Sequence, residues 1–195
     1  MKKIVGFILG ILLFVLLIVL ASTAYKTLTE KYSVPQMNAV DELSAMTGSV
    51  TPEQEEKPDA PDFTVTDRDG NEVKLSDFAG KPVVVNFWAT WCTPCKSELP
   101  AFEDAYKEYG EDVVFMMINL SDSRDTPEVV NQFVADGGYE FPLYFDSKHD
   151  ASATYGIYSI PMTLFVSADG KLDAGYIGAL NETVITSQIE QLLGE

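Results

Sequence analysis

The sequence has few of the side chains that bind metals or attach haem. Its 195 residues include a single histidine, His149, and only two cysteines, Cys92 and Cys95. A structural zinc site usually needs four cysteine or histidine ligands, a set that these three residues do not complete. A c-type haem site needs a histidine directly after the second cysteine, and Lys96 occupies that position. The sequence therefore indicates no bound metal or organic cofactor.

Positively charged side chains are also scarce. The chain has 13 Lys and Arg residues against 30 Asp and Glu residues, which gives a formal net charge of −17. Such a surface repels nucleic acid and anionic lipid, so no nucleic-acid partner is expected. We interpret the acidic excess mainly as a source of solubility, with a weak bias toward basic partners.

Long apolar runs are absent except near the start of the chain. Residues Ile4–Ala21 carry no charge, and about 18 apolar residues suffice for a membrane-spanning helix. Because Lys2 and Lys3 precede this run, the positive-inside tendency keeps the start of the chain in the cytoplasm. Residues 1–21 are thus predicted to form a single-pass transmembrane signal anchor, with the remaining chain on the extracytoplasmic side of a bacterial cell membrane.

A cleaved signal peptide is the alternative interpretation of this segment. Residues Ser22, Thr23 and Ala24 are small, as at a cleavage site. The apolar core of a secretory signal is usually only ~7–15 residues long, so the longer run favours an uncleaved anchor. Both interpretations export the domain.

Residues 22–58 have the composition of a flexible linker. Pro35, Pro52 and Pro58 interrupt the segment, residues 53–56 are Glu-Gln-Glu-Glu, and the apolar residues follow no sustained period. This composition favours a spacer over a packed domain. The compact domain is therefore predicted over residues 59–195.

The remaining sequence alternates strand and helix patterns. Pro82–Trp88 is a nearly continuous apolar run, typical of a central strand buried on both faces. Further strands are predicted over Phe63–Thr66, Glu72–Leu75, Asp112–Leu120, Phe141–Phe145, Pro161–Ser167 and Leu172–Ile177, and helices from Cys92 or Thr93 to Tyr109, from Thr126 to Gly138, over Asp150–Tyr155 and over Asn181–Leu193. This order predicts an α/β fold, a three-layer α/β/α sandwich with an N-terminal β-hairpin and an inserted helix–strand element.

The two cysteines form a Cys-x-x-Cys pair, in Trp91-Cys92-Thr93-Pro94-Cys95. A disulfide that closes so short a loop removes little chain entropy, so it is a poor structural staple. Disulfide exchange instead needs a thiolate attacker and a second thiol nearby. At a helix start, the first sulfur faces unpaired backbone N–H groups that favour its thiolate. The pattern predicts a redox-active disulfide with Cys92 as the exposed attacker and Cys95 as the more buried resolver.

Several further motifs accompany this pair and carry a resemblance to a known family. They are Pro61-Asp-Phe63, Leu75-Ser-Asp-Phe-Ala-Gly-Lys-Pro82, Val85-Asn-Phe-Trp-Ala-Thr-Trp-Cys-Thr-Pro-Cys95, Glu98-Leu-Pro100, Tyr155-Gly-Ile157 and Ile160-Pro-Met-Thr163. From about Pro61 to its end, the chain resembles the thioredoxin superfamily, and within it the membrane-anchored, extracytoplasmic TlpA/ResA-like thiol–disulfide oxidoreductases. The resemblance implies a thioredoxin-like fold.

The resemblance also implies roles for residues outside the dithiol. It implies a cis peptide bond before Pro161 that faces the dithiol and leaves the Ile160 backbone free to pair with a substrate segment. It further implies that Glu98 handles protons for the dithiol; the alternative is a solvated acid on the helix surface. Trp91, Thr93 and Pro94 are expected to bind substrate.

Two positions depart from the pattern of ordinary thioredoxins. Asn86 occupies the place of their buried aspartate, and Met117 that of their strand lysine. Because this acid and its partner are missing, the hypothesis of a proton role for Glu98 is strengthened. Trp88, in contrast with Trp91, is expected to lie in the core.

The function indicated is a thiol–disulfide oxidoreductase that reduces disulfides in exported proteins. Its partners would be a disulfide-containing exported substrate, for which the resemblance suggests apocytochrome c, and a membrane thiol electron donor. An extracytoplasmic dithiol oxidant or isomerase is the main alternative. A thiol peroxidase is disfavoured, because Asn86–Cys92 lacks the proline of the Pro-x-x-x-Thr-x-x-Cys pattern. A non-catalytic binding module is disfavoured by the intact Cys92, Cys95 and Pro161.

Overall fold

The computed structural model describes residues 57–194. The predicted anchor over residues 1–21 and nearly all of the predicted linker over residues 22–58 lie outside this range. Within the described part of the chain, no helix is both long enough and apolar enough to cross a membrane.

A seven-stranded mixed sheet forms the centre of the domain, in the strand order β2-β1-β5-β4-β3-β6-β7. Strand β3 (Val83–Trp88) lies between β4 (Val114–Asn119), to which it is parallel, and β6 (Met162–Val166), to which it is antiparallel. All six residues of β3 are buried, which confirms the prediction from its continuous apolar run. Such a strand needs a covering layer on each face of the sheet.

Four further strands extend the sheet to its two edges. The predicted hairpin is confirmed as the antiparallel pair β1 (Thr64–Thr66) and β2 (Glu72–Lys74). It joins the sheet through β5 (Leu143–Phe145), which is parallel to β4. At the other edge, β7 (Leu172–Ile177) pairs with β6 in an antiparallel arrangement.

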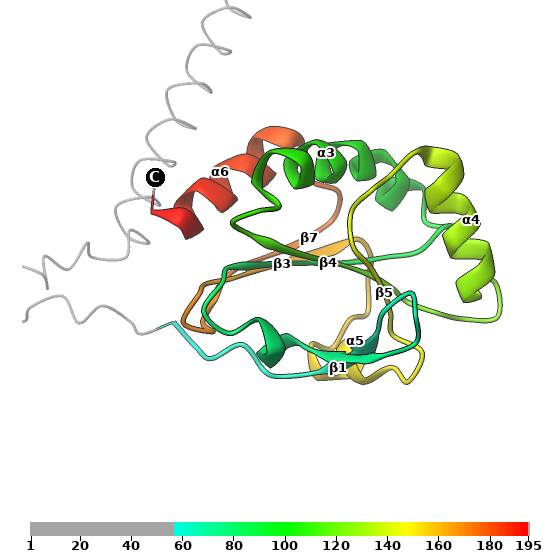
Figure 1. Cartoon of the computed structure of the whole chain (residues 1–195), viewed down its shortest axis with the longest axis horizontal. Helices are drawn as coiled ribbons and strands as arrows, with labels where there is room; N and C mark the ends of the chain where they lie inside the picture. Colours follow the sequence, from blue (N-terminus) through cyan, green and yellow to red (C-terminus); the bar gives the residue numbers. More distant parts are fainter. Residues whose placement is uncertain (1–56, 195) are drawn as a thin grey trace, which may run out of the picture. The chain divides into compact units, whose positions relative to one another are not determined.

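Helices cover the two faces of the sheet unequally. Helices α3 (Thr93–Tyr109), α4 (Pro127–Gly137) and α6 (Glu182–Leu193) lie on one side, and the short α5 (Asp150–Thr154) lies on the other (Figure 1). The second face also receives the 3₁₀ turn Leu75–Phe78, whose Leu75 is buried there with Phe63 and Val65. The predicted three-layer sandwich is thus confirmed. Three helices form one outer layer, and the short α5 and the 3₁₀ turn form the other.

Local sequence signals explain where the helices begin and end. Thr126 caps α4 by accepting a hydrogen bond from the Val129 N–H, and Gly138 ends it with a positive φ of 68°. That left-handed conformation suits glycine, which has no Cβ. Asn181 caps α6 through a 3.0 Å hydrogen bond from the Val184 N–H. These ends agree with the predicted ones to within a residue or two.

The topology brings two distant segments together at one end of β3. Cys92 is the N-cap of α3 and follows the carboxyl end of β3 closely. Strand β6 begins just after Pro161, and Phe87 of β3 pairs with Met162 of β6. Because β3 and β6 are antiparallel, the start of β6 must lie beside the end of β3. Cys92 and Pro161 therefore meet, although 68 residues separate Cys92 from Ile160.

Candidate active site

The two cysteines form a disulfide at the start of α3. Their Cα atoms are 5.3 Å apart. Cys92 is the N-cap residue, and its sulfur accepts a hydrogen bond from the Cys95 backbone N–H, with an N–Sγ distance of 3.2 Å. A backbone N–H directed at the sulfur favours the thiolate once the disulfide is reduced.

The sulfur of Cys92 is more enclosed than expected. Cys92 is 5% exposed and Cys95 is fully buried, so the expectation of an exposed Cys92 was wrong, while the order of exposure was right. The enclosure comes partly from the peptide bond Ile160–Pro161, which is cis. The Ile160 carbonyl oxygen lies 3.8 Å from Cys92 Sγ, and Pro161 is itself buried. A residue 68 positions away thus covers the sulfur.

Glu98 lies inside the protein, one helical turn after Cys95. It is 1% exposed, so the alternative of a solvated surface acid is wrong. Its two carboxylate oxygens accept hydrogen bonds from the Asn86 side-chain amide and from the Leu180 backbone N–H, each at 2.8 Å. Burial raises the pKa of Glu98 to about 7, although these two hydrogen bonds oppose the shift. The carboxyl group can therefore gain or lose a proton near neutral pH.

Asn86 connects Glu98 to the strand that follows Pro161. The Asn86 amide nitrogen also donates to Thr163 Oγ1, at 3.0 Å, and both residues are fully buried. One polar chain therefore runs from Glu98 on α3 through Asn86 on β3 to Thr163 on β6. Sequence comparison with thioredoxins marked Asn86 as a departure, but its contact with Glu98 follows from packing across the sheet.

The residues around Cys92 that were expected to bind substrate are at the surface. Thr93 and Pro94 are exposed, and Trp91 is 42% exposed. The guanidinium carbon of Arg124 lies 3.9 Å from the centre of the Trp91 ring. Trp88 is fully buried, as predicted for a core residue.

Asp125 is a buried acid near the dithiol that the sequence analysis missed. It accepts hydrogen bonds from the Thr90 N–H at 2.7 Å, from the Thr90 hydroxyl group and from the Asn119 side-chain amide at 2.9 Å. These bonds fasten the loop after β4 to the turn that carries Cys92. The signal available was topological: β3 and β4 are parallel neighbours, so the polar residues that follow each strand lie at the same edge of the sheet.

Comparison with known proteins places this site in a family. Residues 57–174 match the family model described as the AhpC/TSA family. The chain belongs to the AhpC/TSA family. The chain is 33% identical over 134 residues to the thiol-disulfide oxidoreductase ResA of Bacillus anthracis, covering 69% of this chain and 76% of the relative. It is 33% identical over 128 residues to ResA of Bacillus subtilis, covering 65% and 70% respectively.

Solved structures agree with these relatives. StoA from Bacillus subtilis superposes with a TM-score of 0.60 at 27% identity, over 68% of this chain and all of that chain. A putative thiol:disulfide interchange protein DsbE from Chlorobium tepidum superposes with a TM-score of 0.63 at 28% identity, over 71% of this chain and 98% of that chain. The chain is a ResA-like thiol–disulfide oxidoreductase with a thioredoxin-like fold, and the resemblance inferred from its motifs is confirmed.

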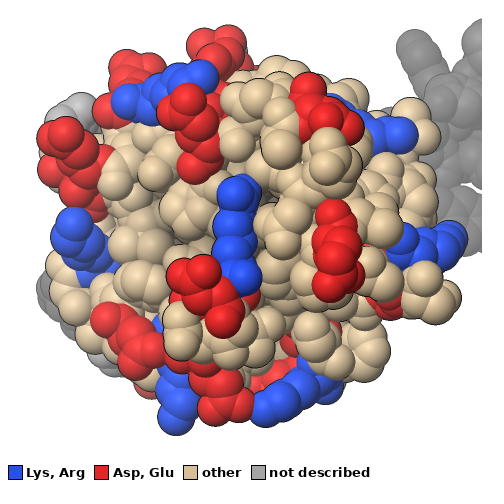
Figure 2. Space-filling view, turned by 45° about the vertical axis from the view of Figure 1, so that its right-hand side comes forward, with Lys and Arg blue, Asp and Glu red and all other residues tan. Residues whose placement is uncertain are grey.

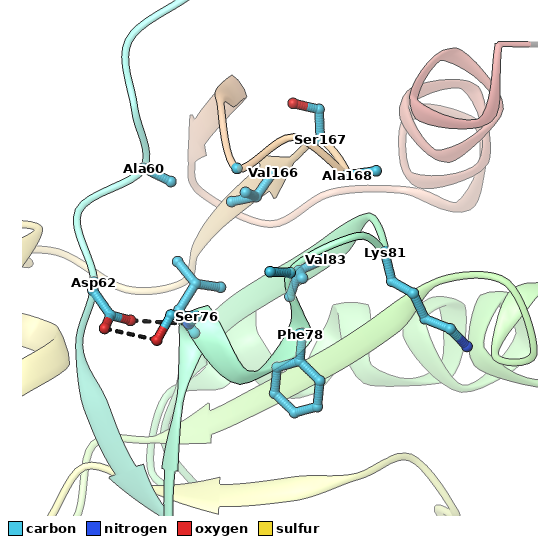
Figure 3. Close-up of a pocket in the computed structure, with 12 residues that line it drawn as sticks. Ala60, Asp62, Ser76, Phe78, Lys81, Val83, Val166, Ser167 and Ala168 are labelled. Atoms are coloured by element: carbon cyan, nitrogen blue, oxygen red, sulfur yellow. Dashed lines mark hydrogen bonds between the residues drawn. The ribbon is translucent and has the colours of Figure 1, made fainter.

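The oxidoreductase also has a cavity at the opposite end of β3. This cavity of about 170 Å³ has Val83, Phe78 and Val166 among its lining residues (Figure 3). At its rim, Asp62 accepts hydrogen bonds from the Ser76 N–H and hydroxyl group, each at 2.9 Å. The Lys81 amine is bound to the Glu111 carbonyl oxygen at 3.1 Å. Because Val83 begins β3 and Trp88 ends it, the cavity and the dithiol lie apart, and the chemistry belongs to the dithiol end.

Charges of both signs share one face of the oxidoreductase. On the face shown in Figure 2, acidic and basic side chains are interspersed with uncharged surface. Within the described residues, no group of three or more His, Cys, Asp or Glu side chains is arranged to hold a metal ion. The chemistry that this site can perform is exchange between the Cys92–Cys95 disulfide and external thiols or disulfides.

Proposed function

We propose that this oxidoreductase reduces disulfides in exported proteins, with Cys92 as the attacking thiol and Cys95 as the resolving thiol. The Cys92 thiolate attacks one sulfur of the substrate disulfide, which forms a mixed disulfide and releases one substrate thiol. Cys95 then attacks Cys92 Sγ, releases the second substrate thiol and re-forms the Cys92–Cys95 disulfide. Two electrons pass to the substrate, and a membrane thiol donor returns two electrons and two protons. The observation that carries the proposal is the Cys92–Cys95 disulfide at the start of α3 beside the Ile160 carbonyl group.

The surroundings of Cys92 favour the reducing direction. A strong dithiol oxidant needs a highly stabilised thiolate. Within the described residues, the polar backbone groups against Cys92 Sγ are one N–H, from Cys95, and one carbonyl, from Ile160. The N–H favours a thiolate, whereas the carbonyl oxygen carries partial negative charge and disfavours it. This balance supports a thiolate that is only partly stabilised, and therefore a reducing dithiol.

The substrate segment would lie across the surface beside Pro161. The Ile160 backbone would pair with an extended substrate chain, and Trp91, Thr93 and Pro94 would contact it from the other side of the dithiol. Two exposed apolar side chains extend this surface. They are Tyr158, which is 84% exposed, and Ile177, which is 56% exposed and pairs with Met162 across β6 and β7. These two were not anticipated from the sequence.

Glu98 would hold the proton that moves when the resolving thiol reacts. Cys95 must lose a proton to attack Cys92 Sγ and regain one on reduction. A buried carboxyl group with a pKa of about 7 is suited to exchange that proton at neutral pH.

The reduction potential of the full chain in detergent tests the direction of electron flow. After equilibration in defined thiol buffers, we expect a value near or below about −230 mV, the lower end of the glutaredoxin range. A value nearer about −120 mV, typical of a strong periplasmic oxidant, would instead identify a disulfide-forming enzyme.

The Glu98→Gln variant tests the proton role. We expect the exchange rate at pH 7 to fall by about 10²-fold, the lower end of general acid–base effects. The rise of the rate with pH near 7 should also disappear. Thiol pKa values and exchange rates identical to those of the unchanged protein would exclude this role for Glu98.

We also propose that residues 1–21 anchor the chain, that residues 22–58 form a spacer, and that residues 59–195 work outside the cytoplasm. The uncharged run Ile4–Ala21 and the two lysines that precede it, Lys2 and Lys3, support this arrangement. A membrane-impermeant thiol reagent should label the reduced cysteines in intact cells. Labelling only after the cells are broken would contradict it.

Apocytochrome c is the substrate that we propose within this class. Cells that lack the protein should make less covalently attached haem, and a Cys92→Ser chain should not restore it. Normal haem attachment in both would direct the search to other exported disulfides.

A further inference from the structure

The loop that follows β4 contacts the Trp91 side chain through Arg124. The guanidinium carbon of Arg124 lies 3.9 Å from the centre of the indole ring, within the range of a cation–π interaction. Trp91 directly precedes Cys92 and is the more exposed of the two tryptophans, 42% against 0% for Trp88. A partly exposed indole beside the attacking sulfur needs a defined orientation if it is to contact a substrate.

Arg124 is itself held in place by its neighbour Asp122. The Arg124 Nε and Nη2 groups donate to Asp122 Oδ2 at 3.2 and 2.9 Å, and the Arg124 backbone N–H donates to Asp122 Oδ1 at 2.7 Å. Asp122 Oδ1 also accepts the Asp125 backbone N–H at 3.0 Å. One carboxylate therefore fixes both the side chain of Arg124 and the turn of the loop that carries it.

The same loop is fastened to the dithiol turn from inside the protein. Buried Asp125 accepts the Thr90 N–H at 2.7 Å, and Thr90 is the residue before Trp91. The backbone at Thr90 and the ring at Trp91 are thus held by consecutive residues, Asp125 and Arg124. The side chain of Arg124 is 61% exposed, so its contact with the ring occurs at the surface that a substrate would approach.

We infer that Arg124 is a positioning residue for substrate binding, which acts by holding the Trp91 ring against one side of the dithiol. This inference rests on the proposed function, because it assigns Trp91 to the docking surface. Arg124 does not take part in thiol exchange. Its loss should weaken substrate binding without slowing the chemical step.

The Arg124→Met variant of the full chain in detergent provides the test. With a disulfide-bonded peptide as substrate, we expect KM to rise about two- to fivefold, the size of an exposed cation–π contact, and kcat to stay unchanged. Arg124→Lys, which keeps the charge but loses the flat guanidinium group, should recover only part of the affinity. Arg68→Met is the matched control, because it removes the same charge from an exposed turn remote in sequence, and it should leave KM unchanged.

A double-mutant cycle separates action through Trp91 from direct contact with substrate. In a Trp91→Ala background, Arg124→Met should not raise KM further. If the two effects on KM simply add, or if Arg124→Met leaves KM unchanged while the unchanged protein turns over normally, the inference is wrong.

Acrylamide quenching of tryptophan fluorescence gives a second readout that needs no substrate. Trp91→Phe leaves only buried Trp88, so the difference from the unchanged protein reports Trp91. We expect Arg124→Met to increase quenching of Trp91, and equal quenching would overturn the contact. Failure of the proposed function would look different: the unchanged protein would not turn over, while the quenching change would persist.

Discussion

Helix α3 carries two buried glutamates, Glu98 and Glu103, in its two halves, and their surroundings differ. Glu98 is 1% exposed, and within residues 57–194 its hydrogen-bond donors are both neutral, the Asn86 amide and the Leu180 N–H. Glu103 is 5% exposed, forms an ion pair with Lys107 at 3.0 Å and accepts the N–H groups of Glu140 and Phe141 at 2.8 and 3.2 Å.

These different surroundings let one helix combine a reactive carboxyl group with a stabilising one. Burial disfavours a charged carboxylate, and neutral donors offset the cost only in part. Glu98 consequently has a pKa of about 7 and lies on the half of α3 that begins with the dithiol. Glu103 is compensated by a cation and two backbone donors, so its role is to join α3 to the chain before β5. We expect substitutions in the first half to affect chemistry and those in the second half to affect stability.

We expect the largest effect, on disulfide turnover, from replacing Cys92, the N-cap residue of α3. Cys92→Ser should lower disulfide turnover by at least about 10³-fold, because a serine hydroxyl group is not a nucleophile at neutral pH without an activating base. Turnover of a disulfide peptide measures the loss, and circular dichroism should show an intact fold. Substantial remaining turnover would mean that Cys95 can attack the substrate itself.

The pH dependence of stability tests the assignment of Glu98. Because its folded pKa of about 7 exceeds the ordinary glutamate value of 4.5, the folded state holds the proton more tightly than the unfolded state. Its contribution to stability is complete below about pH 4.5 and is lost as the pH rises through 7. The free energy of unfolding from Glu98 should fall by up to about 1.4 kcal/mol per pH unit in this window, or ~3 kcal/mol in total.

Urea unfolding at several pH values measures this slope. Glu98→Gln should flatten the curve between pH 4.5 and 7, and Glu103→Gln should leave the slope in place. An equal slope in the Glu98→Gln variant would assign the titration to another group.

Glu103→Gln should reduce stability and spare activity. Its amide cannot form the ion pair with Lys107 and accepts the two backbone N–H groups more weakly, so we expect a loss of about 1–3 kcal/mol in the free energy of unfolding. Urea titration gives this value, and KM, kcat and the reduction potential should remain unchanged. A change in the reduction potential would break the proposed division between the halves.

Lys107→Met should have the smallest effect. The Lys107 side chain is 53% exposed, so water replaces much of its interaction with Glu103. We expect the urea midpoint to fall, but by less than in Glu103→Gln. A larger fall than in Glu103→Gln would show that the cation, rather than the backbone donors, dominates the environment of Glu103.

The order of the elements and the reactive pair could be predicted from the sequence alone. The apolar run that became β3, the Thr126-Pro127 helix start and the glycine that ends α4 are local signals, because periodicity and capping depend on residues a few positions apart. The Cys-x-x-Cys pair was predicted in the same way. The cis bond before Pro161 came from resemblance, since no local signal requires it.

The environment of that pair, in contrast, depends on contacts made by the folded chain. Glu98 is buried because Asn86, 12 residues before it, and Leu180, 82 residues after it, fold against its carboxylate. Cys92 is enclosed because the sheet brings Ile160 to its sulfur. The link between Asp125 and Thr90 likewise exists because β3 and β4 lie side by side. Burial and pKa depend on contacts made across the fold, so a pattern along the chain can name the reacting atoms but not the surroundings that set their reactivity.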